Sequence, residues 1–222
     1  MFKEDTFPPA PLPLKITFIA HSTLMLTWGD TVIHVDPIGE YADYSSMPKA
    51  GLVLVTHHHG DHLDAKAVAA VRTETTSVVV GPKCGQAVEG SIVLQNGDSR
   101  AVKGIRIEAI PAYNVVHERA PGQPFHPKGE GNGYVLTLGS RRLYIAGDTE
   151  NTREMKALRG IDIAFLPMNL PYTMTPEMVA DAAAAFRPKI LYPYHCGETD
   201  TTQLEKLVAS LKDVEVRFRG MK

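Results

Sequence analysis

The sequence has few cysteines, little net charge and no long apolar run. Cys84 and Cys196 are its only cysteines in 222 residues, too few for the disulfide framework of a small secreted protein or for a paired-cysteine zinc site. Their scarcity favours a reducing cytoplasm. The 23 basic and 25 acidic residues nearly cancel, so we expect neither nucleic acid nor an anionic membrane as a partner.

The first residues, MFKEDTFPPAPLPLK, do not form a signal peptide. They include acidic residues and four prolines, where an export signal needs an unbroken apolar stretch, and no later apolar run approaches membrane-spanning length. We therefore predict a protein that is neither exported by that route nor inserted in a membrane. Residues 1–13 are expected to lie extended across the surface.

What is present favours one large domain over residues 1–222, because 44% of the residues are hydrophobic and a chain of this length can build a substantial core. Residues 15–36 read as a β-meander, and residues 162–218 alternate between strands and helices. This pattern predicts two sheets with helices packed outside. Further strands are expected at 51–55, 77–81, 91–95, 104–110, 133–139, 142–147, 162–167, 189–194 and 214–218, and helices at 64–71, 175–186 and 201–211.

The segment THHHGDHLD, residues 56–64, places four histidines and two aspartates directly after the apolar run GLVLV. If the chain stays extended, His57 and His59 point to one face and can hold one divalent ion together. Gly60 then allows a sharp bend, so that Asp61 and His62 suit a second ion beside the first. The run therefore predicts a metal site at the end of a strand.

The spacing His57-x-His59-x-Asp61-His62 resembles the signature of the metallo-β-lactamase superfamily, a group of metal-dependent hydrolases. The resemblance implies an α+β fold, a four-layer αββα sandwich. It also implies that an aspartate in RLYIAGDTE bridges two metal ions and that a histidine ending KILYPYHCG binds the second ion. These residues are Asp148 and His195.

The first metal needs one more histidine, and here the sequence departs from the family pattern. Family members usually carry it shortly after the strand that here reads GIRIEAIPAY, where this chain has Asn114. His126 is favoured because Pro124 and Pro127 restrict the backbone around it, and His117 is the fallback. The predicted metal ligands are therefore His57, His59, Asp61, His62, His126, Asp148 and His195.

Other residues near the predicted site fit either a functional or a purely structural role. Asp36 resembles an aspartate that hydrogen-bonds a ligand histidine, and it also fits an ordinary turn before a proline. His21, in FIAHST, resembles a segment of the branch that includes ascorbate-lactone hydrolases and N-acyl phosphatidylethanolamine phospholipase D, which implies a place in the pocket. Three tyrosines fit either an oxyanion donor or a core position: Tyr113, Tyr172 and Tyr194.

The expected function is hydrolysis of a small ester, lactone, thioester or amide by a metal-bound hydroxide. Asp61, Asp148 and His195 are the expected catalytic residues, and Asp61 becomes the proton acceptor if a single ion is bound. Zinc is the default metal, although manganese, iron and cobalt fit the same donors. A phosphodiesterase is the alternative. A diiron-type redox enzyme is less favoured because such relatives have glutamate in place of His59, and a non-catalytic metal-binding domain is least favoured. Substrate and oligomeric state stay open.

Overall fold

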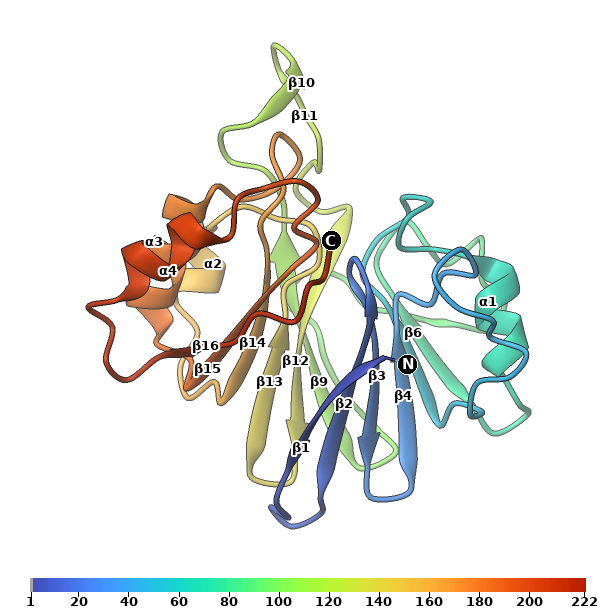
Figure 1. Ribbon diagram of the computed structural model, residues 1–222. Coiled ribbons are helices and arrows are strands. Elements are labelled where there is room, and N and C mark those ends of the chain that lie inside the picture. The colour runs from blue at the N-terminus through green and yellow to red at the C-terminus, as the bar shows by residue number, and fades with distance from the viewer. Residues whose placement is uncertain (1) are drawn as a thin grey trace.

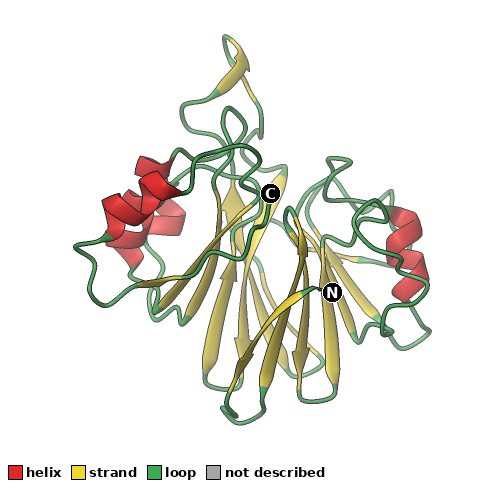
Figure 2. Ribbon diagram, viewed as in Figure 1, coloured by secondary structure: helices red, strands yellow, loops and turns green. Residues whose placement is uncertain are grey.

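The computed structural model describes residues 2–222, and in that range two mixed sheets pack face to face with helices on both outer sides. Figure 1 shows the two sheets side by side, and Figure 2 shows helices on the outer flank of each. The expected α+β, four-layer αββα architecture is confirmed.

The first sheet is built from the N-terminal half of the chain. Its strands β1 to β4 are antiparallel, and β4 to β7 are parallel. In spatial order they are β1 (Lys3–Phe7), β2 (Leu14–Ala20), β3 (Thr23–Trp28), β4 (Thr31–Val35), β5 (Leu52–Val55), β6 (Ser77–Val80) and β7 (Ile92–Val93). Helix α1 (Ala65–Val71) covers its outer face, and Asp64 caps that helix by accepting from the N–H groups of Lys66 and Ala67.

The second sheet contains the remaining long strands. Its first four strands along the chain pair antiparallel, and the pairings from β13 to β16 are parallel. In chain order they are β8 (Ser99–Val102), β9 (Ile105–Ala112), β12 (Gly131–Leu138), β13 (Arg141–Ile145), β14 (Ile163–Pro167), β15 (Ile190–Tyr194) and β16 (Glu215–Val216). The helices on its outer face are α2 (Arg153–Lys156), α3 (Pro176–Phe186) and α4 (Thr202–Val208).

The main core lies between the two sheets. Leu26 and Leu54 of the first sheet and Ile107 and Phe165 of the second are fully buried in one apolar cluster. Because alternate residues of a strand face opposite sides, each sheet also presents apolar side chains to its helices. Two further clusters form there, one under α1 and one under α2, α3 and α4.

Strand direction gathers the functional segments at one end of the sandwich. The pairings make β2, β4 and β5 parallel to one another, and make β9, β13, β14 and β15 parallel to one another. The loops that follow the strands of each set therefore leave the same edge of their sheet. A short hairpin of β10 (Glu118–Ala120) and β11 (Gln123–Pro124) projects beyond the rest of the molecule (Figure 1).

The N-terminal segment differs from the expectation. Met1 lies outside the described residues, and residues 3–7 form the edge strand β1, paired with β2, rather than an unpaired extended segment. The sequence KEDTF is too polar to predict a strand, although its last residue, Phe7, is buried in the core. The sequence also did not predict α2, β8, β10 or β11. Within residues 2–222, no helix is long and apolar enough to cross a membrane.

Candidate metal centre

The THHHGDHLD run leaves β5 at the edge where the parallel strands end. His57 is buried, His58 is exposed and His59 is half-buried, so the side chains alternate as they do in an extended chain, although the backbone has left the strand. The chain turns at Gly60, and the N–H of His62 donates to the carbonyl of His59 over 3.0 Å. This turn carries the next two candidate ligands around to the same side.

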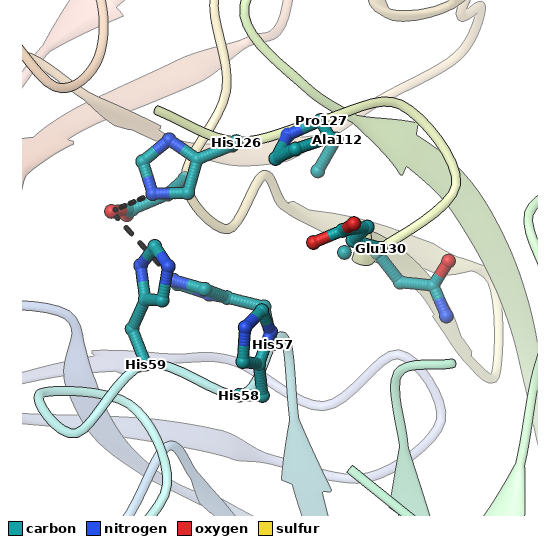
Figure 3. Close-up of a pocket in the computed structure, with 10 residues that line it drawn as sticks. His57, His58, His59, Ala112, His126, Pro127 and Glu130 are labelled. Carbon is teal, nitrogen blue, oxygen red and sulfur yellow. Dashed lines mark ion pairs between the residues drawn. The ribbon is translucent and has the colours of Figure 1, made fainter. Parts of the chain in front are cut away.

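A first group of side chains is formed by His57, His59 and His126. One ring nitrogen from each lies within 4.8 Å of the other two. Figure 3 shows the three rings pointing toward one another, with dashed lines for the ion pairs that His57 and His126 make with Asp148. Three imidazoles at this spacing form a common protein ligand set for a zinc ion.

A second group is formed by Asp61, His62, His195 and His21. Oδ2 of Asp61 lies 3.7 Å from Nε2 of His62, 3.6 Å from Nε2 of His195 and 3.2 Å from Nε2 of His21. His62 and His195 are buried, while the Asp61 side chain is 44% exposed. The second group therefore opens toward solvent through Asp61.

Asp148 lies between the two groups. Its Oδ2 is 3.2 Å from Nε2 of His126 in the first group and 3.3 Å from Nε2 of His195 in the second. Its Oδ1 is 3.3 Å from Nε2 of His62. One carboxylate thus touches both groups, which is the arrangement expected of a bridging ligand. The structure brings all seven predicted ligands together.

Three residues of this region adopt an unusual backbone conformation. His21, Asp36 and His195 have φ angles of 54°, 44° and 48°, in the left-handed region that residues with a Cβ rarely adopt. Each follows the end of a strand, β2, β4 and β15 respectively. Such strain concentrates where the surrounding structure holds a side chain in a functional position.

Several polar atoms of the cluster are buried and form no hydrogen bond, although polar atoms of the cluster lie as close as 3.3 Å. Among residues 2–222, Nε2 of His57, His62 and His195 and Oδ1 of Asp148 have no hydrogen-bond partner. Leaving such atoms unpaired costs about 1–3 kcal/mol each, and folded proteins rarely do so without a reason. All four belong to one cluster of nitrogen and oxygen donors, and a cation at its centre would satisfy them.

Electrostatics distribute the charges unevenly within the cluster. Burial lowers the pKa of His57 well below its ordinary value, with the neighbouring His62 adding to the effect, and burial lowers the pKa of His59 to about 4. Burial would also lower the pKa of His62, but Asp148 and Asp36 outweigh it and hold that pKa well above the usual value. At neutral pH, His57 and His59 therefore have a free lone pair, whereas His62 carries a proton.

Asp36 takes the hydrogen-bonding role rather than that of a simple turn residue. It is fully buried, and its Oδ2 accepts from Nδ1 of His62 over 2.7 Å. Its Oδ1 accepts from the backbone N–H of Thr56 over 2.8 Å. Asp36 thereby fixes both the ring of His62 and the start of the histidine run.

The structure places His126, not His117, in the cluster. His117 lies outside it, with Nδ1 at 2.5 Å from Oε1 of Glu150. Asn114 is held beside His126, and its Oδ1 accepts from the backbone N–H of His126 over 2.7 Å and from Nδ1 over 2.9 Å. The asparagine that stands where a histidine was expected thus orients the histidine that comes from farther along the chain.

The three candidate tyrosines occupy different positions. The Tyr113 hydroxyl donates to Glu154, and the buried Tyr194 hydroxyl accepts from the N–H of Gly147. Tyr172 is 46% exposed and lines a cleft of about 340 Å³ above the cluster. The lining residues are His21, His59, Asp61, Arg119, Phe125, His126, Asp148, Asn169, Tyr172 and His195.

Sequence reasoning missed several residues that shape this region. Asn169 lies 3.4 Å from Nδ1 of His195, and its position directly after β14 among parallel strands was the available signal. Glu150 accepts from the N–H groups of Val115 and Val116 over 2.6 Å each. No local pattern pointed to that contact, because it joins segments about 35 residues apart.

Comparison with known proteins identifies the family. A family model described as a beta-lactamase superfamily domain matches residues 15–195. A UPF0173 metal-dependent hydrolase of Koribacter versatilis is 31% identical over 217 residues, which cover 88% of this chain and 91% of the relative. The chain belongs to the UPF0173 family of the metallo-β-lactamase superfamily. Another UPF0173 metal-dependent hydrolase, from Symbiobacterium thermophilum, is 30% identical over 83% of this chain and 84% of its own length.

The fold of this UPF0173 member is also found in a solved structure. A candidate metal-dependent hydrolase from Parabacteroides distasonis ATCC 8503 is 46% identical, superposes with a TM-score of 0.94, and is covered over 100% of both chains. The superfamily expected from the histidine run is therefore confirmed. The finer branch resemblance drawn from FIAHST stays a prediction.

Proposed function

We propose that the cluster holds two divalent metal ions and that the chain is a hydrolase of small esters, lactones, thioesters or amides. The observation that carries the proposal is the set of buried, unpartnered donor atoms on His57, His62, His195 and Asp148. Membership of a family whose relatives are called metal-dependent hydrolases supports it.

The donor groups divide naturally between two ions. His57, His59 and His126 would hold the first, while Asp61, His62 and His195 would hold the second. Asp148 would bridge the two, since its carboxylate contacts both groups. This division is the ligand set predicted from the sequence.

Zinc is the expected metal because the donors are imidazoles and carboxylates in sets that leave room for water or substrate. Manganese, iron and cobalt fit the same donors. Thiolate chemistry is not expected, because Cys196 is buried in the outer core and burial raises the pKa of its thiol to about 12.

When bound, such ions would lower the pKa of a water toward about 7 and polarise a substrate oxygen, and so would supply a nucleophile at neutral pH. The protein's own residues set the geometry. Asp148 is fixed between the histidines, and Asp61 faces the cleft, where a substrate meets it. Nε2 of His21 lies 3.2 Å from Oδ2 of Asp61, and this contact orients the Asp61 carboxylate at the edge of the cleft.

The cleft supports a small-molecule substrate rather than a polymer. Its volume of about 340 Å³ falls within the usual size range of small-molecule pockets, and the near-neutral charge balance argues against nucleic acid. Cytoplasmic localisation and the resemblance of FIAHST to the lactonase and phospholipase D branch stay predictions.

The proposal is tested by measuring metal content and hydrolysis together. Protein purified without added metal should contain about two transition-metal ions per chain and hydrolyse at least one member of a panel of lactones, thioesters, aryl esters and phosphodiesters. Asp148→Ala should lose metal and at least about a thousandfold of the rate while keeping its far-UV circular dichroism spectrum.

The matched control is Asp30→Ala, which removes an exposed carboxylate in the β3–β4 turn and should behave as wild type. A metal-free wild type with full activity, or an Asp148→Ala variant that turns over at the wild-type rate, contradicts the proposal. Cleavage of phosphodiesters alone would replace the proposed substrate class with the phosphodiesterase alternative.

A further inference from the structure

The cleft above the metal centre has one wall that the hydrolytic chemistry does not use. This wall is formed by Arg119 and Phe125 of the projecting hairpin and by Tyr172 of the loop that follows β14. All three residues line the same cleft as Asp61 and Asp148. Whatever reacts at the cluster must therefore lie against them.

Arg119 is an exposed cation without a carboxylate partner in residues 2–222. It takes part in no ion pair there, and its guanidinium carbon lies over an aromatic ring, 5.5 Å from the ring centre of Phe125. Other basic side chains nearby are already paired. Lys128, for example, donates to Glu154 over 2.7 Å. Arg119 is the single lysine or arginine among the described residues that line the cleft.

The aromatic contacts hold this cation in place. The rings of Phe125 and Tyr172 meet nearly edge to face, with centres 5.2 Å apart and planes at 78°. Phe125 directly precedes the ligand candidate His126, and the backbone carbonyl of Tyr172 accepts from the side chain of Asn114 over 2.9 Å. A guanidinium that lies over the face of a ring uses no N–H group in that contact, so Arg119 can still donate to an oxyanion.

We propose that Arg119, backed by Phe125 and Tyr172, binds an anionic group of the substrate, so that the preferred substrate has a carboxylate or phosphoryl group a few bonds from the linkage that is cleaved. This inference rests on the proposed hydrolytic function and specifies its substrate class. A guanidinium binds both oxyanions through paired hydrogen bonds. The apolar faces of the two rings would contact the chain that joins the anion to the scissile bond.

The binding test needs no turnover. Glutarate has two carboxylates and butyrate has one, so a subsite at Arg119 should make zinc-loaded protein bind glutarate about tenfold more tightly than butyrate. Calorimetry should show that Arg119→Met, which keeps the apolar stem, removes this preference. Arg119→Lys should retain part of it. The matched control is Arg100→Met, which removes an exposed arginine on β8 that does not line the cleft.

The kinetic test compares two aryl esters that differ only in charge. The 4-nitrophenyl monoester of glutaric acid has a free carboxylate, and its methyl ester is neutral. Arg119→Met should raise KM for the anionic ester about tenfold and leave KM for the neutral ester unchanged. A third ester, with a phosphonate in place of the carboxylate, shows which anion the subsite prefers. The preferred anion is the one whose ester has the lower KM.

The two proposals fail differently. Equal affinity for glutarate and butyrate in wild type, or equal effects of Arg119→Met and Arg100→Met, overturns the anion subsite even if every ester is hydrolysed. If wild type prefers glutarate and Arg119→Met does not, but no ester is hydrolysed, the anion subsite is supported and the proposed hydrolysis of esters is contradicted.

Discussion

At the scale of single residues, the rings of His126 and His62 are each oriented by a hydrogen bond on the nitrogen that faces away from the cluster. Nδ1 of His126 donates to Asn114, and Nδ1 of His62 donates to Asp36. A hydrogen bond donated from Nδ1 fixes the plane of the ring and, once the ring is neutral, the tautomer that leaves the Nε2 lone pair free. Metal affinity in this site therefore depends on residues that never touch the metal.

Asn114→Ala tests this dependence. The variant removes the acceptor that holds both the backbone and the ring of His126, so affinity at the first metal position should fall about ten- to a hundredfold. Competition with a chromophoric zinc chelator measures the loss. Asn151→Ala, which removes an exposed hydrogen bond to Asp181, is the matched control. Equal affinities in the two variants would remove the orienting role of Asn114.

Protonation of His62 predicts how metal binding depends on pH. Burial disfavours the charged ring, but Asp148 and Asp36 outweigh it and raise the pKa of His62 well above 6.5. In the metal-free protein the ring is therefore protonated at pH 7, and a metal ion must displace that proton. Zinc affinity should fall as the pH is lowered, because more protons then compete for the site.

Calorimetric titration of zinc at pH 7 in buffers of different ionisation enthalpy counts the released protons. We expect about one from His62 at the second metal position, and fewer for Asp36→Asn, in which one of the two carboxylates that raise the pKa is gone. Circular dichroism shows whether that variant is folded. Zinc binding without proton release in wild type would mean that His62 is already neutral.

The ligand types could be read from the sequence, but of the residues that support them only Asp36 could, as one of two interpretations. The spacing of His57, His59, Asp61 and His62 is local, and the strand that precedes them sets their direction. The choice between His126 and His117 needed the fold, because Asn114 holds one ring and Glu150 holds the other. Those contacts join segments that are distant in the sequence, so they cannot be predicted from a local sequence pattern.

At the scale of elements, the projecting hairpin depends on one buried glutamate. Glu150 is fully buried and accepts from the backbone N–H groups of Val115, Val116 and His117 over 2.6, 2.6 and 2.8 Å. Burial would raise the pKa of this carboxyl, but these N–H groups outweigh it and lower the pKa. Glu150 thus fixes the corner from which the hairpin leaves the fold.

Glu150→Gln should loosen the hairpin without unfolding the sheets. An amide has one acceptor oxygen in place of two, so at least one of the three N–H bonds is lost. Amide hydrogen exchange in residues 113–126 should accelerate about tenfold or more, while β5 and β13 keep their protection. Glu74→Gln, an exposed change, serves as control. Unchanged exchange in the hairpin would show that Glu150 is not its support.

Apolar and β-branched elements were predictable, including the two-residue strands β7 and β16, and charged or mixed ones were not. The runs LVLV and SVVV became β5 and β6, and Thr175 and Pro176 began α3 as expected. By contrast, β1 is charged and depends on pairing with β2. The β10–β11 hairpin lies in a segment for which the sequence predicted no strand, since its residues ERA and QP contain no alternation of apolar and polar residues.

At the scale of the whole molecule, the chain ends close the sandwich beside the metal centre. The N–H of His21 donates to the carbonyl of Lys222 over 3.0 Å, and the N–H of Cys196 donates to the carbonyl of Met221 over 2.9 Å. The N–H of His195 in turn donates to the carbonyl of His21 over 2.9 Å. The last residues are therefore part of the backbone framework that positions His21 and His195.

An ion-pair network joins the C-terminal residues to β1 of the first sheet and β15 of the second. Asp5 of β1 accepts from Arg219 on both carboxylate oxygens, at 3.0 Å from Nε and 2.7 Å from Nη2, and it also accepts from the Tyr192 hydroxyl of β15. The Asp5 side chain is 13% exposed, so water screens the pair only partly. Paired hydrogen bonds between an arginine and a carboxylate are stronger than neutral ones.

Asp5→Asn should therefore weaken the whole fold. Loss of the charged acceptor should lower the free energy of unfolding by about 2–3 kcal/mol, measured by urea titration, while Asp30→Asn should leave it unchanged. Because the tail that carries Arg219 also holds His21 and Cys196, zinc affinity at the second metal position should fall together with stability. Unaltered unfolding in Asp5→Asn would mean that the sheets close without this network.

The difference in unfolding free energy between wild type and Asp5→Asn should depend on pH, because the pKa of Asp5 is lowered in the folded protein. Burial would raise the pKa of Asp5, but Arg219, Tyr192 and Arg217 outweigh it and hold the pKa below 3.8. A carboxyl with a lowered folded pKa stabilises the fold above its unfolded pKa and loses that contribution as the pH falls through the folded value. The gap in unfolding free energy between wild type and Asp5→Asn should therefore be full at pH 6 and narrow below about pH 4. A gap that stays constant over this range would assign the effect of the substitution to packing rather than to charge.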